Sequence, residues 1–381
     1  MIHFKPGSHA YNIIDLLSVT GEFPLSSLEI LGSRQTYENA IRRMLIPQKI
    51  VDGQEEITCK LLTVSGQNGR RKIRLTKEVL PILKWLGAEK YYYENYMRSH
   101  RSSSIEHTIR NARFAESVAM FRSAGYEFRP HLLPRLQVEE RKSIIGSAPV
   151  FYPAKIIKTF DNSDIKKTGF TRMTGALLAH ERAYVVYNTR NELMKGFEGG
   201  GEIKAKVNVA SIAAYNAEGD SCYDYPAIMF GKSYDIAVTM FKAFDEFNKQ
   251  RYRRKRIRPY YPTYYNVYFF TMDTNGVRQL RLMRYPDWEK RILKALFDEE
   301  ELSYAHGFLG YDAYADGIRW FSFLNGDICG LRHFRGSAVE NTKQWGVICF
   351  PHQIDLIWEY VGKKINISTV TLDDLEKAIS Y

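Results

Sequence analysis

The residues from 34 to 43 carry a concentrated set of side chains that can hydrogen-bond to base edges and phosphates. The set contains three arginines, two side-chain amides and a threonine: Arg34, Gln35, Thr36, Asn39, Arg42 and Arg43. Arg, Gln and Asn are the residues that most often contact bases in a DNA groove, and Arg also pairs with phosphate. Tyr37, Ile41 and Met44 recur at helical spacing, so the polar set falls on the opposite face of a helix.

Two further basic groups could contact phosphate. Arg70, Arg71 and Lys72 follow a turn of composition Ser65–Gly69, at the expected tip of a β-hairpin. The second group lies within 249–258 and contains four consecutive basic residues: Arg253, Arg254, Lys255 and Arg256. It fits a phosphate-binding arm or a solvated helix end followed by a linker, and both interpretations stay open. The net charge of +11 favours a polyanionic partner.

Carboxylates at two places could support hydrolysis. Glu202-Ile203-Lys204 matches the last part of an Asp, Glu-x-Lys nuclease site, where carboxylates hold Mg²⁺ and lysine assists the attacking water. Asp312, Asp316 and Asp327 form a second acidic group, although its Asp-Gly and Asn-Gly pairs are also typical of turns. A nuclease with Glu202, Lys204 and Asp316 as catalytic residues is therefore one hypothesis, and a solvated strand edge with surface turns is the other.

The elements expected around the first polar set follow the order of a winged helix-turn-helix. Tyr11–Val19 predicts a helix, a second short helix follows Ser26, and Arg34–Leu45 predicts the third, with Ser33 as its N-cap. A hairpin follows, with strands Glu56–Val64 and Arg70–Thr76. These elements predict a DNA-reading domain over residues 1–90.

The remaining chain predicts an α+β fold. Residues 91–146 form a helical connector that contains a long helix opened by Ser104, and residues 147–258 and 259–381 form two α+β subdomains. We expect Glu202–Ala213 to be a strand, and Asn275-Gly276 to be the turn of a hairpin whose second strand is Val277–Leu282. Both subdomains run from strands toward a helix, so a degenerate duplication into two similar halves stays open.

Composition excludes several classes of protein. With 45% hydrophobic and 25% charged residues, the chain is globular rather than disordered. No apolar run is long enough for a membrane helix and no signal peptide is evident, so we expect a cytoplasmic protein without a membrane partner. The four cysteines form no C-x-x-C pair and the histidines no His-x-His pair, so no resident metal or other cofactor is predicted, Mg²⁺ for a nuclease excepted.

The N-terminal pattern resembles a known family. The helix-turn-helix, the hairpin, Arg74-Leu75-Thr76 and then Ile105-Glu106-His107-Thr108 at the start of a long helix are similar to the replication-relaxation family, over about the first 125 residues. Members are winged-helix proteins of plasmids and integrative conjugative elements. Beyond residue 150 the chain lacks the Pro-Asp, acidic strand and lysine that the family pattern would lead us to expect.

The resemblance implies a role in replication initiation or DNA relaxation, with the N-terminal domain reading double-stranded DNA. Our leading hypothesis is a DNA-binding protein of a bacterial mobile element that acts in replication, conjugation-linked DNA relaxation or transcriptional control. A metal-dependent nuclease delivered by the winged helix is the first alternative. A non-enzymatic module that binds element-encoded proteins is the second, and a homodimer is compatible with each of them.

Overall fold

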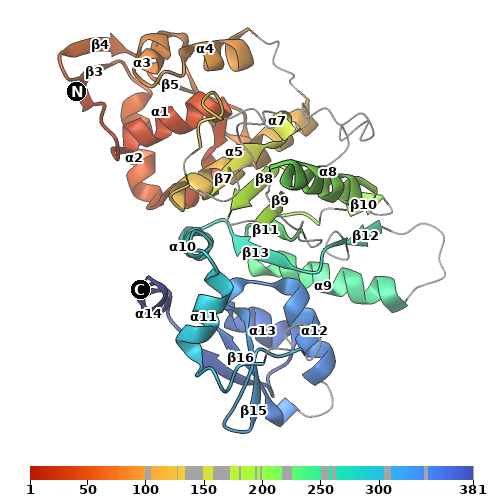
Figure 1. Cartoon of the computed structure of the whole chain (residues 1–381). Helices are drawn as coiled ribbons and strands as arrows, with labels where there is room; N and C mark the ends of the chain where they lie inside the picture. Colours follow the sequence, from red (N-terminus) through yellow and green to blue (C-terminus); the bar gives the residue numbers. More distant parts are fainter. Residues whose placement is uncertain are drawn as a thin grey trace. The chain divides into compact units, whose positions relative to one another are not determined.

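The computed structural model has the mixed α+β architecture that the sequence predicted, with several small sheets (Figure 1). It forms two compact units, unit 1 with Met1–Pro134 and Met272–Thr274, and unit 2 with Arg135–Thr271 and Asn275–Tyr381. The described residues are 1–98, 104–126, 128–133, 149–157, 172–179, 182–193, 195–197, 200–216, 225–249, 257–259, 263–303, 310–338 and 342–380.

Unit 1 consists of helices and two three-stranded sheets. Its helical elements are α1 (His9–Thr20), η1 (Leu25–Leu31), α2 (Arg34–Met44), η2 (Asn68–Arg70), η3 (Lys77–Val79), α3 (Leu80–Trp85), α4 (Glu89–Tyr92), η4 (Tyr93–Met97) and α5 (Ile105–Ser123). Its strands are β1 (Ile2–His3), β2 (Glu22–Pro24), β3 (Gln48–Asp52), β4 (Glu55–Cys59), β5 (Leu62–Ser65) and β6 (Lys72–Leu75). One sheet has the order β1-β3-β4, and the other has the antiparallel order β2-β6-β5.

Serine side chains cap the N-termini of two helices in unit 1, α1 and α5. Ser8 caps α1 by accepting a hydrogen bond from the amide of Tyr11, and Gly21 ends the helix with a φ of 73°. Ser104 opens α5 in the same way, as predicted. Ser33 precedes α2 but its side chain makes no capping hydrogen bond, so only the position of that cap was predicted correctly.

The predicted strand Glu56–Val64 is two strands in the structure. β4 pairs with β3, whereas β5 pairs with β6, so the two halves of the predicted strand belong to different sheets. The chain changes sheet at Lys60 and Leu61, where Leu61 is buried and its amide donates to the carbonyl of Met44. A continuous β-branched pattern does not reveal such a break, because each half keeps its own alternation.

The first part of unit 2 is a five-stranded sheet in the order β13-β11-β9-β8-β7. Its strands are β7 (Val150–Pro153), β8 (Gly175–Ala179), β9 (Arg182–Arg190), β11 (Ala227–Gly231) and β13 (Val267–Thr271), and β10 (Lys195–Phe197) pairs with β12 (Ile257–Pro259) separately. The helices are α7 (Ala154–Ile157), α8 (Gly200–Asn216), α9 (Tyr234–Lys249), α10 (Thr274–Leu282) and α11 (Trp288–Leu296). β13 completes this sheet although it lies in the range 259–381, which the sequence assigned to the second subdomain.

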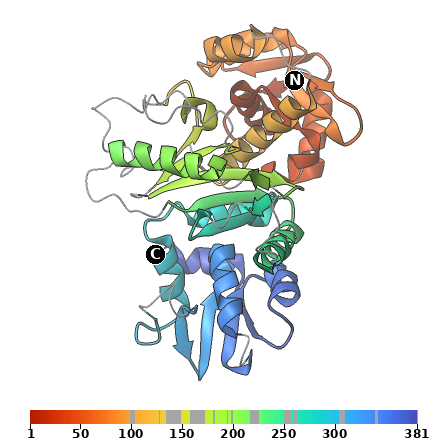
Figure 2. The ribbon, with the colours of Figure 1, turned by 90° about the vertical axis from the view of Figure 1, so that its right-hand side faces the viewer.

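The second part of unit 2 repeats this topology on a smaller scale (Figure 2). Its elements are β14 (Ala313–Ala315), β15 (Ile318–Ser322), α12 (Ile328–Ala338), β16 (Trp345–Cys349), α13 (Ile354–Tyr360), β17 (Asn366–Thr369) and α14 (Leu372–Ile379). In both parts an antiparallel strand pair precedes two parallel strands that follow helices, in the orders β8-β9-β11-β13 and β14-β15-β16-β17. The two parts of unit 2 thus share their strand topology, but the first part includes β13, which lies beyond the division at residue 259 that the sequence suggested.

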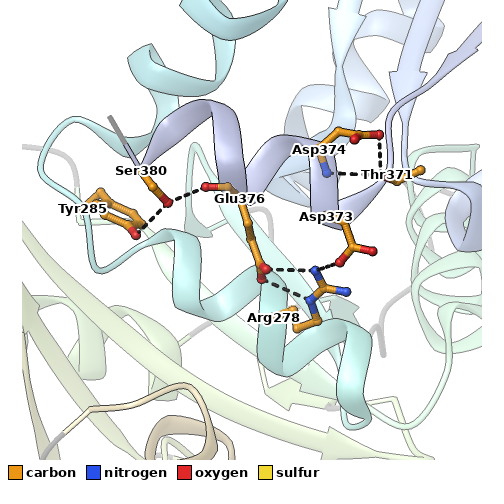
Figure 3. A network of polar contacts seen from close by, with 7 residues as sticks. All are labelled: Arg278, Tyr285, Thr371, Asp373, Asp374, Glu376 and Ser380. Carbon is orange, nitrogen blue, oxygen red and sulfur yellow. Dashed lines mark hydrogen bonds and ion pairs between the residues drawn. The ribbon is translucent and has the colours of Figure 1, made fainter.

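Topologically equivalent helices of the two halves contact each other. α9 meets α13, where the rings of Phe241 and Tyr360 stack 3.8 Å apart. α10 meets α14, where Arg278 donates from Nη2 and Nε to the carboxylate of Glu376 over 2.8 and 3.1 Å and also binds Asp373 (Figure 3). Contacts between matching elements are what an approximate two-fold relation between the halves produces.

Two predicted strands of unit 2 are helices. Glu202–Ala213 lies in α8, where Ala205, Val209 and Ile212 are buried at helical spacing although valines had suggested a strand. Val277–Leu282 lies in α10. The segment Asn275-Gly276, expected to be a hairpin turn, is the first turn of that helix. Residue 276 is a glycine because a Cβ at this position would overlap the carbonyl oxygen of Thr271. This glycine permits a helix to approach a strand closely and does not form a hairpin turn.

Candidate nucleic-acid interface

The helix α2 presents the first polar set to solvent. Tyr37, Ile41 and Met44 are buried beneath it. The six residues that the sequence singled out are all exposed: Arg34, Gln35, Thr36, Asn39, Arg42 and Arg43. The amide nitrogen of Gln35 donates to Oδ1 of Asn39 over 3.3 Å, and Arg42 and Arg43 occupy the last turn. This outward face therefore combines paired amides with two cationic side chains.

Arg34 is engaged by two carboxylates. Its Nε lies 3.0 Å from Oε1 of Glu38 and its Nη1 lies 3.3 Å from Oε1 of Glu29. The hydrogen bonds that Arg34 donates to Glu38 and, second, to Glu29 raise the pKa of Arg34. The spacing of four between Arg34 and Glu38 is visible in the sequence and could have predicted the first of these pairs. Arg34 is thus the member of the set whose charge is compensated within the protein.

The β5–β6 hairpin brings only two of the three basic residues Arg70, Arg71 and Lys72 to the surface. Arg70 and Arg71 are exposed in the loop that joins the strands. Lys72 is different, because its ammonium lies 2.7 Å from Oε1 of Glu22 and its side chain is 12% exposed. Lys72 therefore contributes to packing, and the prediction that it contacts a ligand at the hairpin tip is corrected.

Glu22 holds the hairpin through a nearly buried charge cluster. Its side chain is 7% exposed and accepts hydrogen bonds from Lys72, from Nε of Arg74 at 2.8 Å and from Asn111 of α5 at 3.4 Å. Burial alone would raise the pKa of Glu22, but hydrogen bonds to Lys72 and Arg74 and their charges bring it below its ordinary value. No local sequence signal identifies Glu22, since Lys72, Arg74 and Asn111 lie 50, 52 and 89 residues away.

We expect Glu22→Ala to lower the free energy of unfolding at pH 7 by about 3 kcal/mol, because Lys72 and Arg74 would be left without a counter-charge. Because the pKa of Glu22 is lowered in the folded state, its stabilisation is present above pH 4.5 and is lost as the pH falls through the folded value. Urea unfolding at pH 7 and pH 3 measures both effects. Glu56→Ala, which removes an exposed ion pair with Lys49, should cost less than about 1 kcal/mol. Equal losses in the two variants would contradict this role of Glu22.

The predicted nuclease residues do not converge. Glu202 is 3% exposed whereas Lys204 is exposed, because residues two apart on a helix point in nearly opposite directions. A strand would have placed both side chains on one face. Asp316 lies in the exposed turn between β14 and β15 with a φ of 52°. In the described part of the chain, no three His, Cys, Asp or Glu side chains are close enough to hold a metal ion.

The other two carboxylates of the acidic group have structural contacts. Asp312 accepts a hydrogen bond from the amide of Ser322 over 2.7 Å and so fixes the start of the second sheet. Asp327 precedes α12 and accepts from the amides of Val267 and Cys329 and from Nδ2 of Asn266. Asp327 therefore connects β13 of the first half to α12 of the second.

The second basic group and the cysteines were also singled out from the sequence. Four predicted phosphate contacts lie outside the described residues: Arg253, Arg254, Lys255 and Arg256. Cys59, Cys329 and Cys349 are buried, and Sγ of Cys329 donates to the carbonyl oxygen of Tyr264 over 3.7 Å. Among the helices described, none combines the length and apolar character that crossing a bilayer requires.

The chain was compared with protein-family models, curated proteins and solved structures. No family model matches it, and neither a curated protein nor a solved structure is significantly similar to it.

Proposed function

We propose that residues 1–90 form a winged helix-turn-helix and that the protein binds double-stranded DNA in the cytoplasm. In this proposal α1, η1 and α2 are the three helices, and the sheet β2-β6-β5 carries the wing. The hairpin β3–β4 is an insertion between α2 and β5. The succession of elements supports the assignment, because the strand after the first helix pairs with the second strand of the wing hairpin.

The outward face of α2 is the observation that carries the proposal. It offers base-reading amides and two arginines on a helix whose other face is buried. Arg70 and Arg71, exposed in the β5–β6 loop, supply positive charge for a phosphate backbone. We retain Arg42, Arg43, Arg70 and Arg71 as the cationic contacts, and we leave out Lys72 and Arg34 because carboxylates of the protein engage both.

The proposal does not include hydrolysis by unit 2. Glu202 and Lys204 lie on opposite faces of one helix and Asp316 lies in the turn between β14 and β15, so the three do not support a common site. A role in replication initiation, DNA relaxation or transcriptional control on a mobile element rests on the sequence resemblance in the first 125 residues. The double-stranded DNA partner rests on the face of α2.

Fluorescence anisotropy of the full chain with a labelled random-sequence duplex tests the proposal. We expect binding that weakens steeply as the salt concentration rises, because each phosphate contact releases a counterion. Single-stranded DNA of the same length is the comparison. Absence of saturable binding to the duplex at low salt would overturn the proposed function.

A further inference from the structure

Three side chains form the outward ridge of α2. Gln35, Asn39 and Arg42 follow one another at spacings of four and three, and they lie opposite the buried Tyr37 and Met44. At about 100° per residue these three positions fall nearly on one line along the helix. A helix that enters a groove with its outward face would therefore bring Gln35 and Asn39 nearest to the bases, with Arg42 at the C-terminal end of the same line.

Charge is distributed unevenly between the two ends of α2. At the N-terminal end Arg34 is paired with Glu29 and Glu38, so one positive and two negative charges leave a net charge of −1. Arg42 and Arg43 at the other end carry +2 and have no ion pair within the described part of the chain. Phosphate is repelled at the N-terminal end of α2 and attracted at its C-terminal end, so α2 favours one orientation on a duplex.

The two amides between these ends are already hydrogen-bonded to each other. Gln35 uses one Nε2 donor and Asn39 uses its Oδ1 acceptor in the 3.3 Å bond. The pair retains both Nδ2 hydrogens of Asn39 and a second lone pair on its Oδ1, and it retains Oε1 and the second Nε2 hydrogen of Gln35. Adenine presents an acceptor, N7, beside a donor, N6, in the major groove, whereas guanine presents two acceptors. Nδ2 of Asn39 used together with Oε1 of Gln35 complements adenine, whereas on guanine the same two groups would place Oε1 against an acceptor.

We propose that Gln35 and Asn39 act together as the specificity-determining residues and read one adenine in the major groove. Arg42 and Arg43 contact phosphate beside that base pair. This inference rests on the proposed DNA-binding function and adds to it the identity of a base and the residues that select it.

Selection from a duplex library with a randomised central segment tests the inference with the full-length chain. We expect wild type to enrich an adenine at one position, and to bind the selected duplex on the order of tenfold more tightly than a duplex with G·C at that position. In Asn39→Ala and in Gln35→Ala this ratio should fall close to one. Arg42→Ala should weaken both duplexes alike, because a phosphate contact carries no sequence information.

The outcomes separate the inference from the function on which it rests. If wild type binds no duplex, the proposed function fails. If wild type binds and both amide variants keep the adenine preference, only the inference is overturned. A guanine preference that disappears in Arg42→Ala also overturns it, since Arg42 would then read the base. The fold of Gln35→Ala, Asn39→Ala and Arg42→Ala is verified by thermal unfolding, with midpoints expected within a few degrees of wild type.

Discussion

Replacing Arg42 and Arg43 together with alanine should weaken duplex binding by about tenfold or more at physiological salt. Both side chains are exposed on the last turn of α2, where no carboxylate of the described residues neutralises them. The logarithm of affinity falls linearly with the logarithm of salt concentration, and each lost phosphate contact should make this negative slope shallower by about one. Anisotropy titrations at several salt concentrations measure both quantities.

A matched variant removes the same charge from another surface of unit 1. Lys77 and Lys84 are exposed in η3 and α3. Lys77→Ala/Lys84→Ala lowers the net charge by two without touching α2, so its affinity should stay within about twofold of wild type. If the two double variants lose affinity equally, binding depends on net charge alone and α2 is not the contact surface.

Replacing Asp327 with alanine should lower the free energy of unfolding of unit 2 by about 3 kcal/mol. The side chain is 4% exposed, and its loss leaves the amides of Val267 and Cys329 without their acceptor. It also removes the cap of α12. Urea unfolding of the full chain, followed by hydrogen exchange of the amides in β13 and α12, locates the loss. Unchanged exchange in these two elements would contradict the proposed connection between the halves.

The same carboxyl should make stability depend on pH. Burial raises the pKa of Asp327 from 3.8 to about 6, despite hydrogen bonds from Asn266 and from backbone amides. Between about pH 4 and pH 6 the folded chain therefore retains a proton that the unfolded chain has lost. The contribution of the Asp327 carboxyl to the free energy of unfolding falls as the pH rises through this window and is constant above it. Asp327→Asn keeps an acceptor for the amides, so it should cost less than alanine and should abolish this pH dependence.

The parts of the fold that local patterns specify were predicted from the sequence. Ser104 begins a long helix as predicted, and the spacing of Tyr37, Ile41 and Met44 identified the buried face of α2. The polar residues opposite them are exposed as expected. These predictions depend on neighbouring residues only, which is why a single sequence contains them.

Features that depend on distant residues were not predictable in the same way. Gly276 is required by the nearby carbonyl of Thr271, and no local signal distinguishes that requirement from a hairpin turn. Lys72 follows a turn sequence and was therefore placed at a hairpin tip, but it pairs with Glu22, fifty residues earlier. The prediction of a strand at Glu202 was wrong because its valines fit both an alternating and a helical pattern. The segment is part of the helix α8 in unit 2.

Site-specific photocrosslinking of the full chain to its selected duplex tests most directly whether α2 and the β5–β6 loop contact DNA. A photoreactive residue would be introduced at position 42, 70 or 84 in separate proteins, each first shown to bind the duplex. We predict crosslinks from Arg42 and Arg70, and none above background from Lys84. A chain that binds the duplex but crosslinks from position 84 and not from position 42 would contradict the proposed interface.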